Sequence, residues 1–296
     1  MATTRWVAAP KDRGVLSNLR DVAVFLDASK RGEAAGRHAA ALAKRHGAHL
    51  VGVFGVSRER ALHHASGYVR GGAIRHLIHQ QRRQDEKHAL IAGRWFGELV
   101  DEFGVSSEFR IVWHDGPLGD SVLRALHCDL IVATHPKPAH LPASWSAEEL
   151  LLTTGIPTLL LPEGWPGGEI GAHVMIAWNR SREARRAVAD AMAFIAGAGH
   201  VTILVVDADR DPDHFGDNPG ENILQHVSRH NANVELACVS SEGASIASVI
   251  LEQARHRQVD LTVIGAYSRP RSTKVMFGGV TRSLLTLTRS PLLISR

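Results

Sequence analysis

Glycines close to the end of the chain have the spacing of a loop that could bind an anion. Gly265 ends a short apolar run, Ser268 follows it, and after nine more residues the chain continues as Gly278-Gly279-Val280-Thr281. A glycine lets the chain leave a strand tightly. Glycines at the start of a helix present backbone N–H groups where the helix dipole favours negative charge. The spacing therefore indicates a phosphate-binding loop between a strand and a helix.

Basic residues accompany this loop. From residue 261 to residue 296 the sequence has no Asp or Glu, and its charged residues are Arg269, Arg271, Lys274, Arg282, Arg289 and Arg296. Such groups form charge-assisted hydrogen bonds with phosphate. Arg269, Arg271 and Lys274 lie inside the loop, so we expect them to contact a bound phosphate. The alternative is that they are ordinary solvent-exposed surface residues.

The elements that would position the loop belong to a pattern that occurs twice. An apolar run ending in Asp27 and one ending in Asn179 are each followed by an alanine-rich helical segment, and later apolar runs also correspond. Short apolar runs that alternate with helices are typical of buried parallel strands in α/β folds. We therefore expect two tandem domains, each a five-stranded, mainly parallel sheet flanked by helices.

The domain boundary is expected in the Pro- and Gly-rich residues 162–168, which suit a linker. The first domain would be residues 1–165, with a long insertion at 57–105, and the second residues 166–296. Within the insertion, an apolar stripe with helical spacing is expected in a core or interface: Trp95, Phe96, Leu99 and Phe103.

The last strand of each domain is apolar and would form a sheet edge that needs covering. These strands contain Leu159-Leu160 and Leu292-Leu293. We expect the two domains to pair through them within the chain, and two chains to form a homodimer.

The glycine loop, the Asn179-x-Ser181 start and the internal repeat resemble the universal stress protein family in its tandem form. The resemblance covers nearly all of residues 20–296. It implies binding of ATP, ADP or AMP, with Mg²⁺ if the nucleotide is ATP. The positions that match the family's nucleotide-binding residues are Asn179, Val206, Gly265, Ser268, Gly278, Gly279, Val280 and Thr281.

The sequence departs from the family pattern at three of these positions. Asn179 replaces the usual Asp beside adenine, and an amide can still form a hydrogen bond there. Ser268 replaces the second glycine, which adds a Cβ where φ would be positive in the family loop. Gly279 replaces the Ser or Thr that caps the helix and touches phosphate, while Thr281 could supply a hydroxyl instead.

The first half lacks the glycine loop. Pro136 and Pro138 stand in the corresponding stretch, and proline removes an N–H donor that a phosphate would need. Asp27 with Ser29 is interpreted as a signal for a helix N-terminus. We therefore expect any nucleotide to bind only in the second domain.

Several other kinds of chemistry are not expected. A net charge of +4 does not indicate a nucleic-acid or membrane partner. Cys128 and Cys238, the only cysteines, are expected to be buried free thiols in a reducing, cytoplasmic compartment. The histidines complete no recognisable metal-ligand set, and no residue stands out as a general base or other catalytic group.

The expected function is a regulatory or stress-response protein whose second domain binds an adenine nucleotide. One alternative is a protein-interaction scaffold that binds no nucleotide in either domain. The other is an enzyme that hydrolyses ATP slowly.

Overall fold

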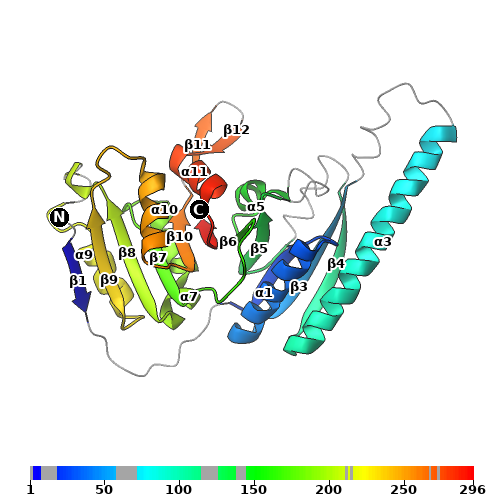
Figure 1. Cartoon of the computed structure of the whole chain (residues 1–296), viewed down its shortest axis with the longest axis horizontal. Helices are drawn as coiled ribbons and strands as arrows, with labels where there is room; N and C mark the ends of the chain where they lie inside the picture. Colours follow the sequence, from blue (N-terminus) through cyan, green and yellow to red (C-terminus); the bar gives the residue numbers. More distant parts are fainter. Residues whose placement is uncertain are drawn as a thin grey trace. The chain divides into compact units, whose positions relative to one another are not determined.

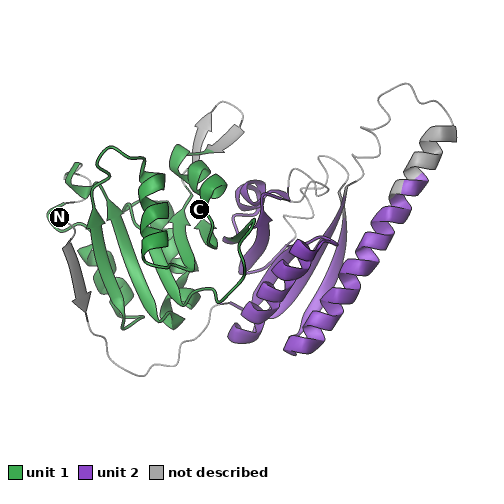
Figure 2. Cartoon of the chain, in the orientation of Figure 1, with its two compact units in different colours: residues 1–18, 159–296 green, residues 19–158 purple. Residues whose placement is uncertain are grey.

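The computed structural model describes residues 3–7, 19–57, 72–114, 126–137, 145–210, 213, 216–266, 268–271 and 274–296. The chain divides into two compact units (Figure 2). Unit 2 is residues 19–158, and unit 1 combines residues 1–18 with residues 159–296.

Unit 2 is a parallel sheet with helices packed on it (Figure 1). The strand order is β5-β2-β3-β4, and each neighbouring pair is parallel. In chain order its elements are β2 (Asp21–Leu26), α1 (Lys30–His46), β3 (His49–Ser57), α3 (Gly72–Phe103), β4 (Ser107–His114), β5 (Leu130–His135) and α5 (Ala147–Thr154).

Helix α1 has the predicted start signal. The Asp27 carboxylate is 2% exposed and accepts a hydrogen bond from the Ser29 N–H at 2.7 Å. The Ser29 hydroxyl then accepts from the Gly32 N–H at 3.1 Å, as an N-cap does. Gly47 ends the helix at a φ of 63°, where glycine is favoured. The interpretation of Asp27 and Ser29 as a helix signal is confirmed.

The aromatic side chains of helix α3 pack against two glycines, Gly36 of α1 and Gly52 of β3. A Cβ at Gly36 would lie 2.6 Å from the Trp95 ring, and one at Gly52 would lie 2.8 Å from the Phe96 ring. Trp95, Phe96 and Leu99 are at most 8% exposed. The prediction that this part of the insertion belongs to a core is confirmed for these three residues. None of the described helices is long and apolar enough to cross a membrane.

Unit 1 has the same pattern with additional elements. Its strand order is β1-β9-β8-β7-β10-β13-β6, and the part from β9 to β10 is parallel, as is the pair β10 and β13. Its elements are β1 (Thr3–Val7), β6 (Thr158–Pro162), β7 (His173–Ala177), α6 (Arg182–Asp190), α7 (Met192–Gly197), β8 (His200–Val206), η3 (Ala208–Arg210), α9 (Glu221–Ser228), β9 (Val234–Val239), α10 (Ile246–His256), β10 (Leu261–Gly265), β11 (Ser268–Arg271), β12 (Lys274–Phe277), α11 (Gly279–Leu287) and β13 (Leu292–Ser295).

The helices of unit 1 lie on both faces of its sheet. The chain moves in one direction through β7, β8 and β9, and returns to β10 on the other side of β7. Right-handed crossovers then place α6 and α9 on one face, and α10 and α11 on the opposite face. Figure 1 shows α10 and α11 in front of this sheet and α9 behind it.

Two strands belong to a different unit from the one expected from the predicted domains, residues 1–165 and 166–296. Strand β1 was expected in the first domain but pairs antiparallel with β9 of the second half. Strand β6 lies next to β13 in the strand order of unit 1. In both places the unpaired N–H and C=O groups of an edge strand are satisfied by an added strand.

The two cysteines are free thiols, and each is half-buried where the sequence predicted full burial. Cys128 lies just before β5, and Cys238 is the next-to-last residue of β9. Burial raises the pKa of the Cys128 thiol to about 12.

Candidate functional site

The sheet of unit 1 has a point at which the strand order reverses. Among β9, β8, β7, β10 and β13 the chain passes first through β7, and its later strands lie on either side of it. Ligands of such parallel sheets bind beyond the carboxyl ends of the strands at this position, here between β7 and β10. Asn179 and Gly265, two of the predicted site residues, lie at the ends of these two strands, and their role in binding a nucleotide stays a prediction.

The strand registers bring three of the predicted residues together. Ala177 pairs with Leu204, and extending this register by two residues places Asn179 beside Val206. Ile176 pairs with Val263, and the same extension places Gly265 beside Trp178. Since neighbouring strands lie about 4.8 Å apart, the ends of β8, β7 and β10 form one continuous edge.

Asn179 also starts helix α6. Its side-chain oxygen accepts hydrogen bonds from the Ser181 N–H at 3.2 Å and the Ser181 hydroxyl at 2.7 Å. The Ser181 hydroxyl accepts from the Ala184 N–H at 3.0 Å. Two of these bonds have counterparts in unit 2, from the Ser29 N–H to the Asp27 carboxylate and from the Gly32 N–H to the Ser29 hydroxyl, so this local structure is repeated. Asn179 differs from the buried Asp27 because it is exposed.

Gly265 has a role that the sequence did not reveal. A Cβ at this position would lie 2.3 Å from the Ala184 N atom and 2.3 Å from the Glu183 carbonyl carbon. The first turn of α6 therefore packs directly on the backbone at the end of β10. Only glycine leaves room for this approach, so Gly265 fixes the position of α6 beside the reversal point.

The segment between Gly265 and Gly278, predicted as a phosphate-binding loop, contains a β-hairpin. Strands β11 and β12 pair antiparallel, and Ser268 pairs with Phe277. Ser268 is therefore in extended backbone, where a side chain carries no steric penalty. The backbones of Arg269, Arg271 and Lys274 belong to the hairpin, while their side chains lie outside the described part of the structure.

Helix α11 starts with an open N-terminus. Gly278 is its N-cap residue and has no side chain that could accept from the first N–H groups. Gly279 and Val280 are exposed, the first turn has no acidic residue, and a Cβ at Gly279 would meet no atom within 4 Å. These features fit an anion at the helix N-terminus. Thr281 is only 4% exposed, so its side chain faces the interior.

In unit 2 the corresponding positions differ. Asp27 occupies the end of β2, Pro136 follows β5, and Pro138 lies outside the described residues. Among the residues that the structure describes, no group of three or more His, Cys, Asp or Glu is placed to hold a metal ion.

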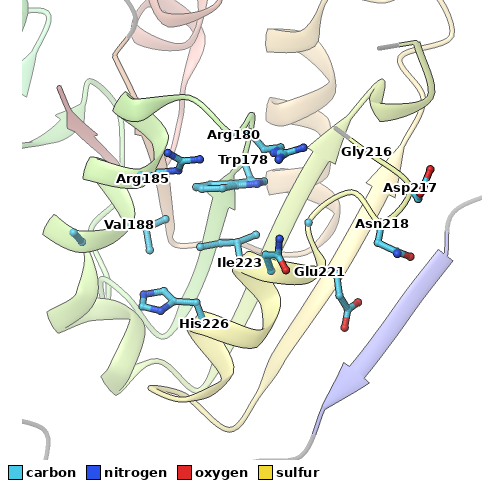
Figure 3. Close-up of a pocket in the computed structure, with 13 residues that line it drawn as sticks. Trp178, Arg180, Arg185, Val188, Gly216, Asp217, Asn218, Glu221, Ile223 and His226 are labelled. Carbon is cyan, nitrogen blue, oxygen red and sulfur yellow. The ribbon is translucent and has the colours of Figure 1, made fainter. Parts of the chain in front are cut away.

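Sequence reasoning missed a cavity on the α6 and α9 side of unit 1. It has a volume of about 650 Å³ and includes Trp178, Arg180, Arg185, Glu221 and His226 in its lining (Figure 3). The only available signal was that Trp178 and Arg180 flank Asn179. Residues 216–223 of the opposite wall carry no recognisable motif.

Comparisons with known proteins agree with this fold. The model of the universal stress protein family matches residues 172–296. A universal stress protein from Archaeoglobus fulgidus DSM 4304 is similar over 94% of this chain and 99% of its own, with a TM-score of 0.68 and 13% identity. A functionally unknown protein from Pseudomonas aeruginosa PAO1 is similar over 94% and 92%, with a TM-score of 0.57 and 16% identity. No curated protein sequence gives a significant match.

Proposed function

We propose that the protein is a stress-response regulator that binds an adenine nucleotide. The proposal rests on the match of residues 172–296 to the universal stress protein family and on the similarity of the whole chain to a universal stress protein with the tandem α/β fold. The nucleotide would be ATP, ADP or AMP, and the site would lie in the second half. Mg²⁺ would accompany ATP, held by its phosphates.

The observation that carries this proposal is the position of the open α11 N-terminus. Gly278 leaves the first N–H groups of α11 without a side-chain cap, and the preceding strand β10 ends at the reversal point of the sheet. An anion there would gain both backbone hydrogen bonds and the helix dipole. The N–H groups of Gly279, Val280 and Thr281 would bind phosphate.

The remaining predicted residues would hold the rest of the nucleotide. Adenine would bind at the ends of β7 and β8, where extending the printed pairing of Ala177 with Leu204 brings Asn179 near the main chain of Val206. Arg269, Arg271 and Lys274 would add charge-assisted contacts to phosphate from the β11–β12 hairpin.

A single substitution separates anion binding from folding. We expect Gly279→Glu to weaken AMP and ATP binding at least about tenfold, because a carboxylate would occupy the position of the phosphate. The same carboxylate at a helix N-terminus stabilises the helix, so loss of binding would not reflect unfolding. Titration calorimetry on the whole chain measures the affinity.

Two variants control for this test. Gly279→Gln has the same size without charge and is expected to bind AMP more tightly than Gly279→Glu. Thr286→Glu adds the same charge at an exposed position late in α11, and is expected to bind like the unmodified protein. Equal affinity of all four proteins for AMP would refute the phosphate site at α11.

A nucleotide-free scaffold is the second candidate function. It is favoured by the bonds between the Asn179 side-chain oxygen and Ser181, since the same oxygen is then engaged within the protein. Absence of nucleotide binding in every calorimetric titration would support it.

We further propose that the protein is cytoplasmic, that its halves pair within the chain, and that it forms a homodimer.

A further inference from the structure

The cavity between α6 and α9 has the size and lining of a small-molecule site. Its volume of about 650 Å³ lies within the usual range for ligand pockets, roughly 300–1,000 Å³. We propose that it binds a small organic anion with an aromatic or aliphatic body, separately from the nucleotide site at α11. This proposal goes beyond the proposed nucleotide binding and does not depend on it.

The charge that selects an anion comes from Arg185. Helix α6 carries three arginines, of which Arg182 pairs with Glu183 at 3.5 Å and Arg186 pairs with Asp190 at 2.9 Å. Arg185 lines the cavity and makes no ion pair with any residue that the structure describes. A guanidinium beside a cavity can bind a carboxylate, sulfonate or phosphate through two parallel hydrogen bonds.

An apolar surface lies beside this charge. Trp178, Val188 and Ile223 line the cavity and are 8%, 2% and 7% exposed. In the view of Figure 3, Arg185 extends toward the Trp178 indole from one side and Ile223 lies on the other. An anion at Arg185 would therefore have an apolar body placed against the indole and the two aliphatic side chains.

The other wall determines which further groups the ligand would carry. Asp217 and Glu221 lie there with Asn222, so the ligand would present a hydroxyl or amine to these acceptors. His226 is at the α9 end of the cavity (Figure 3). Its pKa is lowered by burial and by the nearby His230 and Arg229, so at pH 7 it supplies a neutral imidazole.

Arg180, one of the residues that line the cavity, has an uncommon backbone conformation. Arg180 has a φ of 58°, in the left-handed region that non-glycine residues rarely adopt and that is often found at binding sites. Its guanidinium reaches the opposite wall, because a Cβ at Gly216 would lie 3.8 Å from an Arg180 Nη1 atom. The two arginines thus border the same opening from α6 and from the turn before it.

The cavity and the phosphate site use different faces of the sheet. The cavity is lined by residues of α6 and α9 and of the segments before them, whereas the phosphate would bind at the N-terminus of α11. Helices α6 and α9 lie on one face and α11 on the other. A phosphate at α11 and a ligand in the cavity would therefore not overlap. Because the cavity residues Trp178 and Arg180 flank Asn179, displacement by AMP tests whether the adenine end of a nucleotide reaches the cavity.

The test uses 8-anilinonaphthalene-1-sulfonate, an anion with an aromatic body whose fluorescence rises when it is bound. We expect the whole chain to bind it, and Arg185→Gln to bind it at least about tenfold more weakly. Ala189→Trp places an indole in the cavity from an exposed position and is expected to weaken dye binding by a similar factor. Arg182→Gln, at a side chain that is 92% exposed and outside the cavity, is the matched control and should bind normally.

Each outcome decides the proposal. Loss of dye binding in Arg185→Gln and Ala189→Trp, with normal binding in Arg182→Gln and no displacement by AMP, would support it. Equal dye affinity in all variants, or no dye binding at all, would overturn it. Displacement of the dye by AMP would overturn the separation of the two sites. Circular dichroism spectra of the variants must match, because the dye also binds partly unfolded chains.

Discussion

Replacing Gly265 with alanine tests how the candidate site is assembled. The added Cβ would lie 2.3 Å from backbone atoms of Glu183 and Ala184, and backbone atoms cannot rotate away as a side chain could. Overpacking of this kind costs about 1–3 kcal/mol. We expect the midpoint of thermal unfolding of unit 1 to fall by roughly 2–12 °C, and the urea midpoint to fall with it.

The matched control is Gly279→Ala. A Cβ at Gly279 would meet no atom within 4 Å, and the position is helical, so alanine is expected to stabilise unit 1 by about 0.4–1 kcal/mol. Both variants remove a glycine of the predicted loop, but only one disturbs packing. If Gly265→Ala unfolds at the same temperature and urea concentration as the unmodified protein, α6 does not pack on β10 as described.

Three further predictions concern the rest of the chain. Burial and the neighbouring His200 lower the pKa of His173, so as the pH falls below about 6.5 the His173 imidazole is protonated in the unfolded chain before it is protonated in the folded one. The unfolding free energy measured with urea should therefore drop between pH 7 and pH 5.5, and should drop less in His173→Gln. Since burial raises the pKa of Cys128 to about 12, iodoacetamide at pH 8 should label Cys238 before Cys128, and the reverse order in peptide mass spectra would contradict this. Asp260 accepts hydrogen bonds from three backbone N–H groups at 2.7–3.0 Å, so Asp260→Leu should lower the unfolding free energy by about 2–4 kcal/mol, and an unchanged urea midpoint would show that these bonds contribute little.

The repeat and its strands could be predicted because their signals are local. Apolar runs such as residues 22–26 and 174–178 have the length of buried strands, and Asp27-x-Ser29 and Asn179-x-Ser181 carry their own capping chemistry. Each of these signals lies within a few residues of the element that it predicts. Five strands of each half were predicted in this way and are present among the described residues.

The features that were missed depend on contacts between distant residues. The pairing of β1 with β9 places Thr3 beside Cys238, and nothing in residues 3–7 indicates a partner so far along the chain. The role of Gly265 depends on the approach of Glu183 and Ala184. The cavity between α6 and α9 likewise forms only when two helices are packed, so neither composition nor spacing could predict it.

The position of a bound nucleotide is the central claim, and photo-crosslinking tests it most directly. The chain would be illuminated with 2-azido-AMP, digested and mapped by mass spectrometry, with excess AMP as competitor. We expect a crosslink that AMP suppresses, in peptides that contain Asn179 or Val206 at the ends of β7 and β8. A suppressible crosslink at Asp27 in unit 2, or none anywhere, would contradict it.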